Sequence, residues 1–393
     1  MRFSAFKSLF FLLLLYPTLL FSQIRTGSER TELFLSLLKD KRVAICGNQT
    51  SRIGNTHLVD TLFNLKINIV KVFAPEHGFR GEAEAGALIK SGRDPITNLP
   101  VVSLYGNNKK PTPEQMKGID IIIFDIQDVG CRFYTYISTL HYIMEAAAEQ
   151  NVKVLILDRP NPNGYFVDGP VLEEKFKSFV GMHPIPVVHG MTIGEYALMI
   201  NGERWLSNNQ ICDVDVIKME GYDHNLRYFL PFYPSPNLKT DESIYLYPSL
   251  CLFEGTEISL GRGTEKPFQI FGHPQLLDGD YYFTPIPIKG VSENPPQNGI
   301  KCRGYDLTEY AQSHLHTSNS FDIKYLLQAY QNFPNKDQFF LKNNFFDKLA
   351  GNSTLRWQII NGRTEKEIRD SWQKGLIEFK KIRKQYLLYP DFE

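Results

Sequence analysis

Four apolar segments decide the fold of this sequence: RVAIC at residues 42–46, INIVKVF at 67–73, DIIIF at 120–124 and KVLIL at 153–157. Each is a short run rich in β-branched residues, which is typical of a strand buried on both faces of a sheet. A further strand is predicted at 101–105. Segments with apolar residues at helical spacing precede or separate these strands, at 31–39, 57–65, 112–117 and 134–150. This alternation predicts an α/β fold whose mainly parallel sheet is covered by helices on both faces.

The length and composition favour two packed domains. The chain has 393 residues, more than the roughly 250–300 at which a single core usually stops growing. Hydrophobic residues make up 42% and aromatic residues 13%, which indicates a globular protein rather than a disordered one. Basic and acidic residues number 43 each. This balance argues against nucleic acid as a partner, because phosphate binding requires a basic surplus.

The composition changes after Pro160, where Pro- and Gly-rich segments alternate with aromatic ones up to about Leu238. We therefore predict a first domain at 24–238 and a second at 239–393. The second domain is expected to end in a helix that begins near Thr364. Its buried face is predicted to carry Ile368, Trp372, Leu376, Phe379 and Tyr386. Its solvated face is predicted to carry most of the basic run Lys380, Lys381, Arg383 and Lys384.

The amino terminus has the pattern of a secretory signal. Arg2 and Lys7 precede or flank a run that is almost wholly apolar from Leu9 to Phe21. A signal peptide has a basic start and an apolar run of roughly 7–15 residues, whereas a membrane span requires about 20. We predict removal of residues 1–23, export to the periplasm or the extracellular space, and no stable membrane insertion afterwards. An uncleaved signal anchor is the alternative.

The five cysteines are widely scattered, and the sequence contains no CxxC pair. A zinc ribbon and a thioredoxin-type site are therefore excluded. An oxidising compartment allows one or two disulfides, but the odd count leaves at least one thiol unpaired.

Polar side chains follow the predicted strands at the points where they end. Ligands of parallel open sheets bind beyond the carboxyl ends of the strands, so we expect a site there. One such residue alone has ordinary explanations; Asp128, for example, is a candidate cap for the helix predicted from Tyr134. The candidates are Asn48, Glu76, His77, Arg80, Glu82, Asp125, Asp128, Arg159 and Asn161.

The segment APEHGFRGEAEAG at 74–86 is the richest in candidate residues. Glu76 and Glu82 are two carboxylates on one glycine-containing loop, with His77 between them. Glycoside hydrolysis commonly uses paired carboxylates, one of which protonates the leaving oxygen. Nearby Phe73 and Phe79 provide the apolar surroundings that raise the pKa of a general acid. The alternative is that Glu82 begins a solvated helical turn.

Other chemistries have less support. The sequence has no GxSxG, HExxH, P-loop or GxGxxG motif. The nearest glycine pattern, at 261–263, does not follow a first strand, so we predict no nicotinamide cofactor. We also predict no metal requirement. The alternative is a divalent-metal site of hard carboxylates and one imidazole, formed by His77, Asp125, Asp128 and Asp158.

Eight blocks of this sequence, in order, resemble the YbbC/NamZ family, glycoside hydrolase family 171. They cover nearly the whole chain after the signal. The blocks are GNQTS (47–51), APEHGFRGE (74–82), FDIQDVGCRFYTYISTL (124–140), LDRPNPNG (157–164), PSPNLKT (234–240), EGTEISLGRGTEKPFQ (254–269), FDKLAG (346–351) and WQKGLIEFKKIRKQYLLY (372–389).

The resemblance implies a Rossmann-like first domain, with a smaller α+β second domain that closes a cleft. It implies an exo-β-N-acetylmuramidase, which releases N-acetylmuramic acid (MurNAc) from the non-reducing ends of peptidoglycan-derived MurNAc-GlcNAc saccharides. Carried over by position, Glu76 becomes the catalytic acid, with Glu82 as its companion and His77 beside it. Tyr134 and Arg132 fall in the third block and join the predicted substrate-binding residues.

Selectivity for MurNAc requires a cation, because its lactyl ether carries a carboxylate that GlcNAc lacks. Arginine suits this task, since its planar fork binds carboxylates bidentately. The candidates are Arg80, Arg132, Arg159 and Arg262. Arg262 is favoured by its two flanking glycines, which allow close approach to a ligand; the alternative is that it pairs with Glu257 or Glu265.

Two further readings stay open alongside the glycosidase. One is a metal-dependent esterase or amidase that acts on cell-wall material through His77 and the aspartates. The other is a non-catalytic glycan-binding protein, in which the residues at the strand ends only recognise sugar.

Overall fold

The computed structural model describes residues 24–81 and 92–393. Its first domain is built on a seven-stranded sheet in the order β5-β6-β4-β1-β7-β8-β9, parallel throughout except for the edge strand β5. Among the parallel strands, chain order runs outward on one side of β1 and then on the other, as in a Rossmann fold. The strands are β1 (Val43–Gly47), β4 (Ile69–Ala74), β5 (Gly92–Arg93), β6 (Pro100–Ser103), β7 (Ile121–Asp125), β8 (Lys153–Leu157) and β9 (Val214–Ile217).

The central strands are apolar along their whole length because both faces of the sheet are buried. In β7, Ile121 and Ile123 belong to one apolar cluster, whereas Ile122 and Phe124 belong to another on the opposite face. Successive side chains of a strand point to opposite faces, so a strand covered on both sides reads as one continuous run. This confirms the predicted fold class.

Helices cover the two faces of this sheet. The first face packs on α4 (Tyr136–Gln150) and α5 (Ile193–Gly202), and the second on α2 (Leu58–Asn64) and the segment that contains α1 (Thr31–Phe34). α4 begins two residues later than predicted, so Tyr134 and Thr135 lie in the preceding turn. The remaining elements of this domain are the hairpin of β2 (Arg52–Ile53) and β3 (Thr56–His57), helix α3 (Pro113–Met116), and the 3₁₀ turns η1 (Gly27–Glu29), η2 (Leu35–Leu38), η3 (Glu174–Phe176) and η4 (Ser207–Asn209).

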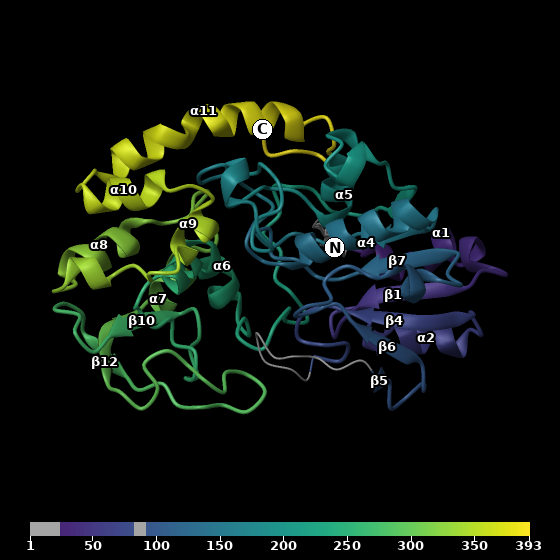
Figure 1. Cartoon of the computed structure of the whole chain (residues 1–393), viewed down its shortest axis with the longest axis horizontal. Coiled ribbons are helices and arrows are strands. Elements are labelled where there is room, and N and C mark those ends of the chain that lie inside the picture. Colours follow the sequence, from purple (N-terminus) through teal and green to yellow (C-terminus); the bar gives the residue numbers. More distant parts are fainter. Residues whose placement is uncertain (1–23, 82–91) are drawn as a thin grey trace, which may run out of the picture.

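The second domain combines a small antiparallel sheet with helices (Figure 1). The sheet has the order β10-β12-β11, with β10 at Ile270–His273, β11 at Tyr281–Phe283 and β12 at Cys302–Asp306. The resemblance implied this smaller α+β domain. Its other elements are α6 (Asp241–Leu250), η5 (Cys251–Gly255), α7 (Thr308–His314), α8 (Lys324–Asn332), η6 (Lys336–Gln338), α9 (Phe345–Ala350) and α10 (Thr354–Ile360).

The last helix, α11 (Glu365–Arg383), joins the two domains. It runs along the top of Figure 1 from α10 to the neighbourhood of α5. Ile368, Trp372, Leu376 and Phe379 are buried as predicted. The prediction of a solvated basic face is wrong for Arg383, which is fully buried: its guanidinium donates to the carbonyl of Gly190 and pairs with Asp391 at 2.8 Å.

All five cysteines lie in the described residues, are buried, and carry free thiols. The predicted signal, residues 1–23, lies outside the described residues. In the part of the chain that the structure covers, no helix combines the length and apolar character needed to cross a bilayer.

Candidate functional site

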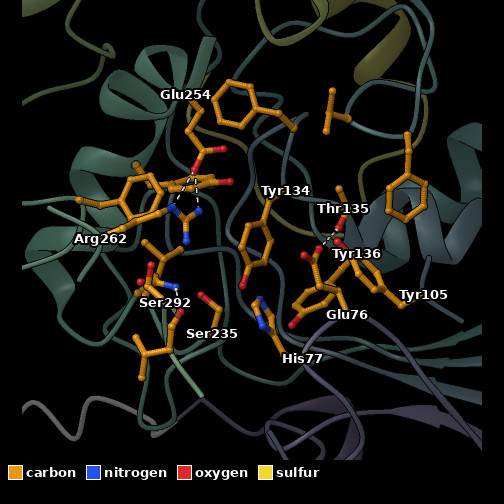
Figure 2. A pocket seen from close by; sticks show the side chains of 18 of the residues that line it. Glu76, His77, Tyr105, Tyr134, Thr135, Tyr136, Ser235, Glu254, Arg262 and Ser292 are labelled. Carbon is orange, nitrogen blue, oxygen red and sulfur yellow. Dashed lines mark hydrogen bonds and ion pairs between the residues drawn. The ribbon is translucent and has the colours of Figure 1, made fainter. Parts of the chain in front are cut away.

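A cavity of about 530 Å³ lies where the carboxyl ends of the strands meet the second domain. The first domain supplies the segments that follow β4, β6 and β7, and the second supplies η5, the turn after it and the loop near residue 292 (Figure 2). The described residues that line it are Glu76, His77, Tyr105, Phe133, Tyr134, Thr135, Tyr136, Phe179, Val180, Ser235, Asn237, Leu238, Tyr247, Glu254, Arg262, Phe268, Val291, Ser292, Asn294 and Phe345.

Glu76 reaches this cavity from the loop that follows β4. Its Oε2 accepts a hydrogen bond of 3.0 Å from the Thr135 hydroxyl (Figure 2). Thr135 is the N-cap residue of α4, yet its side chain makes no capping bond to that helix. The hydroxyl that would ordinarily cap a helix therefore holds the Glu76 carboxylate instead.

Two tyrosines adjoin Glu76. Burial, and then the neighbouring Glu76 carboxylate, raise the pKa of Tyr105 well above its ordinary value, and the Tyr105 hydroxyl is within hydrogen-bonding reach of that carboxylate. The same two causes raise the pKa of Tyr136, whose hydroxyl donates to the carbonyl of Pro234 at 3.0 Å. Both phenols therefore stay protonated at neutral pH, and Tyr105 acts as a donor toward Glu76.

His77 has an unusual backbone conformation, with φ of 69°, and it is followed by Gly78 with φ of 81°. Positive φ is costly for a residue with a side chain and is concentrated at functional sites. The turn directs His77 into the cavity, where it lies beside Tyr134 (Figure 2). The Tyr134 hydroxyl points toward His77 and Ser235.

The opposite wall carries an ion pair from the second domain (Figure 2). Arg262 donates to Oε1 of Glu254 through Nε at 3.1 Å and through Nη2 at 2.5 Å. Burial lowers the pKa of Arg262, but the Glu254 carboxylate outweighs it and raises that pKa above its ordinary value. The predicted alternative of an ion pair was right in kind, but the partner is Glu254 rather than Glu257 or Glu265.

Four predicted site residues thus line the cavity: Glu76, His77, Tyr134 and Arg262. Glu82 lies outside the described residues. The other seven are held in the scaffold, and each has a structural reason.

Asp125 and Arg159 form an ion pair with each other, and neither lines the cavity. The guanidinium donates to both Asp125 oxygens, at 2.5 and 3.0 Å, and Asp125 is fully buried. Asn48 is also fully buried, and its Oδ1 accepts from the amide and hydroxyl of Thr50. These three residues fix the turns after β1, β7 and β8, so the prediction that they bind substrate is not supported.

The guanidinium groups of Arg80 and Arg132 are engaged in structural contacts. Arg80 forms bidentate pairs with Asp60 and Asp94, at 2.8–3.1 Å. Arg132 is fully buried and donates to three backbone carbonyls, those of Pro170, Ile185 and Leu349. Neither guanidinium lines the cavity, which removes both as candidates for binding the lactyl group.

Asp128 and Asn161 are buried beside the strand ends. Asp128 accepts from the amide of Gly130 at 2.7 Å rather than capping α4, and burial raises its pKa to about 7. Asn161 donates to the carbonyl of Met191 at 2.9 Å. Both stabilise the loops that follow β7 and β8 instead of facing the cavity.

The alternative metal site is not assembled. In residues 24–81 and 92–393, no group of three or more His, Cys, Asp or Glu side chains is placed to hold a metal ion. Asp158, one of its four proposed ligands, instead accepts hydrogen bonds from the hydroxyls of Thr192 and Tyr389.

The structure adds three residues that sequence reasoning did not select. Tyr105 lies two residues after the end of β6 at Ser103, but the strand was predicted to extend to residue 105, so the rule of strand ends did not select it. Thr135 lies in the same block as Tyr134. Glu254 begins the block that contains Arg262, but its position opposite Glu76 depends on how the domains pack.

A Rossmann-like domain with a carboxylate-bearing cavity at its strand ends, walled by a second domain, defines a two-domain α/β enzyme with a small-ligand site. The family descriptions "Exo-beta-N-acetylmuramidase NamZ, N-terminal" and "Exo-beta-N-acetylmuramidase NamZ, C-terminal" match residues 43–242 and 245–389. The chain belongs to this NamZ family, which confirms the resemblance seen in the sequence.

Individual relatives agree over nearly the whole chain. The peptidoglycan β-N-acetylmuramidase NamZ of Bacillus subtilis (strain 168) is 42% identical over 373 residues, which cover 90% of this chain and 88% of the relative. Two crystal structures of DUF1343 family proteins from Bacteroides fragilis NCTC 9343 are also similar. One is 47% identical with a TM-score of 0.87, covering 94% of this chain and 100% of its own. The other is 31% identical with a TM-score of 0.76, covering 93% and 99%.

Proposed function

We propose that this protein is an exo-acting glycoside hydrolase that releases MurNAc from the non-reducing end of peptidoglycan fragments. Membership of the NamZ family, together with 42% identity to a peptidoglycan β-N-acetylmuramidase, supports the reaction class. The observation that carries the proposal for this chain is the Glu76 carboxylate, which projects into the cavity and is oriented there by Thr135.

Glu76 acts as the general acid in this proposal. It transfers its proton to the glycosidic oxygen while the bond from C1 of MurNAc to that oxygen breaks, so the leaving sugar departs as a neutral alcohol. The Thr135 and Tyr105 hydroxyls hold the carboxyl group, which keeps the donated proton directed at the substrate. Water then supplies the hydroxyl that ends on C1, and the proton that water releases replaces the one that Glu76 gave up. Glu82 stays the predicted companion carboxylate.

We also propose that the protein is exported, and works in the periplasm or outside the cell. The amino-terminal pattern of Arg2, Lys7 and the apolar run that follows supports this. We expect the protein in the exported fraction. Mass spectrometry of that protein should show a mature amino terminus near residue 24. An intact Met1 in a membrane fraction would instead indicate a signal anchor.

The decisive test is incubation with a chromogenic β-MurNAc glycoside, with the matching β-GlcNAc glycoside as control. We expect turnover of the first to exceed that of the second. On glycan chains of defined length, we expect single MurNAc units released from one end. Mid-chain fragments would contradict exo action, and no turnover of any glycan would favour a binding protein.

Dialysis against a chelator distinguishes the proposed glycosidase from the alternative of a metal-dependent esterase or amidase. We expect activity on the MurNAc glycoside to survive it. Loss of that activity, restored by a divalent ion, would favour metal-dependent chemistry.

A further inference from the structure

The terminal MurNAc of a glycan carries two distinguishing groups on adjacent ring carbons. C3 bears the lactyl ether with its carboxylate, and C4 bears a hydroxyl that is free only at a chain end. In every internal MurNAc the C4 oxygen is part of a glycosidic bond and has no proton to donate. An enzyme that acts on terminal MurNAc is therefore well served by a cation and a hydrogen-bond acceptor placed side by side.

The charged residues of the cavity include one such pair. Among the described lining residues, the carboxylates are Glu76 and Glu254, and Arg262 is the one Arg or Lys. Arg262 uses Nε and Nη2 to hold Glu254. Within the described residues its Nη1 makes no hydrogen bond, so a donor remains for a ligand carboxylate.

Glu254 likewise uses only one of its two carboxylate oxygens in the ion pair. Both bonds from Arg262 end on Oε1. In the described part of the chain Oε2 accepts no hydrogen bond, and it is not among the buried polar atoms without a partner. Figure 2 shows this second oxygen pointing away from Arg262. The ion pair thus offers one free donor and one free acceptor close together.

The pair is held rigidly. Arg262 lies between Gly261 and Gly263, with φ of 73° and 81°. A Cβ at Gly261 would lie 2.5 Å from Ile270, and one at Gly263 would lie 2.5 Å from the carbonyl oxygen of Ile286. The guanidinium also lies over the Phe268 ring, 4.9 Å from its centroid. This preorganisation reduces the entropy lost when a ligand is bound.

We propose that Arg262 and Glu254 together recognise the terminal MurNAc: Arg262 binds the lactyl carboxylate through Nη1, and Glu254 accepts the hydrogen bond of the free C4 hydroxyl through Oε2. The pair faces Glu76 across the cavity (Figure 2), which suits C3 and C4 on the side of the sugar ring away from the scissile bond. This inference rests on the proposed function and assigns its selectivity to the second domain.

Three chromogenic β-glycosides test the assignment: MurNAc, its lactyl amide, and 4-O-methyl-MurNAc. For the wild type we expect kcat/KM to fall roughly 10- to 100-fold on each modified substrate, the range typical of a lost hydrogen bond to a charged group. Arg262→Ala should lose a similar factor on MurNAc, mainly through KM, and lose little more on the amide. Arg262→Lys, which keeps the charge but not the planar fork, should recover part of the loss.

Glu254→Gln should change the selectivity in a different way from the Arg262 variants. It should shrink the discrimination against 4-O-methyl-MurNAc, because the charged acceptor is gone. It should keep or increase the preference for MurNAc over the amide, because Arg262 is no longer neutralised. Arg356→Ala is the matched control: Arg356 pairs with Asp347 at 2.7 Å in the same domain but does not line this cavity. It should leave all three rates unchanged.

Equal losses on MurNAc and the amide in both Arg262 variants, with unchanged thermal unfolding midpoints, would overturn the role of Arg262. Persistent discrimination against the 4-O-methyl substrate in Glu254→Gln would overturn that of Glu254. Failure of the proposed function has a different result: the wild type itself would hydrolyse none of the MurNAc substrates.

Discussion

At the scale of single residues, Thr135 shows how the site was built from a helix terminus. The amino end of an α-helix leaves backbone donors unpaired, and an N-cap hydroxyl usually accepts from one of them. Thr135 gives up this role, since its hydroxyl donates to Glu76. Such a cap is ordinarily worth about 1 kcal/mol. Stability of α4 is therefore exchanged for a fixed orientation of the carboxyl group.

Glu76→Gln should lower kcat on natural fragments by roughly 10²–10⁴, the usual contribution of a positioned general acid. The amide keeps the shape of the side chain but has no acidic proton to give. A glycoside with a very good leaving group should recover much of the rate, because its departure needs no proton. Steady-state kinetics on both substrates measure this. The exposed Glu114→Gln serves as control, and near wild-type rates on natural fragments would disprove the assignment.

The raised pKa of Asp128 should make the stability of the protein depend on pH. Its pKa of about 7 in the folded protein exceeds the ordinary value of 3.8 because burial disfavours the charged form. Between these values the folded chain retains a proton that the unfolded chain releases, so stability falls as pH rises from about 4 to about 7. The loss is on the order of 4 kcal/mol, since each pKa unit corresponds to about 1.4 kcal/mol.

Asp128→Asn removes this titration. The free energy of unfolding in urea, measured for both proteins from pH 4 to pH 8, should shift in favour of the variant as pH rises. The exposed Asp280→Asn is the control. A difference that does not change with pH would show that Asp128 titrates normally.

At the scale of elements, the sequence predicted the inner strands of the large sheet and missed its two edge strands, β5 and β9. β1, β4, β7 and β8 are continuous apolar runs, so their burial is visible in the residues themselves. β9 reads VDVI, and its residues Val214 to Val216 are partly or fully exposed at the edge of the sheet. An edge strand of this length has no distinctive pattern.

The rule of strand ends located the site but selected too many residues. Glu76 and His77 line the cavity as the rule predicts, yet Asp125 and Arg159 obey the same rule while forming an ion pair with each other. Loops that leave a sheet need polar side chains to satisfy buried backbone groups and charges. A sequence does not show which of these side chains turn into the cavity, because that depends on partners far away along the chain.

Arg383→Ala should destabilise the protein by about 3–5 kcal/mol, the usual result of breaking a buried ion pair. The change removes the bonds to Gly190 and Asp391 and leaves a cavity at the end of α11. Urea unfolding measures the loss. The neighbouring Lys381→Ala, on the exposed face of the same helix, should change stability by less than about 0.5 kcal/mol. Equal effects of the two variants would contradict the role given to Arg383.

At the scale of the whole molecule, the two domains are not independent. Arg132 of the first domain donates to the carbonyl of Leu349 in the second. After α11 the chain returns to the first domain, where the Tyr389 hydroxyl donates to Asp158 at 2.6 Å and the amide of Leu388 donates to Glu195 at 2.8 Å. The first domain therefore depends on residues at the far end of the sequence.

A fragment of residues 24–242 should consequently fail to fold stably, although it contains the whole seven-stranded sheet. Asp158, Glu195 and Arg132 would each lose a buried partner. Circular dichroism and gel filtration of the fragment should show an unfolded or aggregated chain, and co-expression with residues 243–393 should restore a compact species. Cooperative unfolding of the isolated fragment at the midpoint of the full chain would refute this dependence.

The docking of Tyr389 on Asp158 also has a consequence for the order of events during synthesis. Multidomain chains generally fold from the amino terminus as they leave the ribosome. Here the first half of the chain emerges long before Tyr389, which completes the hydrogen bonds of Asp158 and follows it by 231 positions. The buried carboxyl group of Asp158 therefore lacks this partner until the segment that carries Tyr389 has been made. The first domain is thus completed only after α11 has been synthesised.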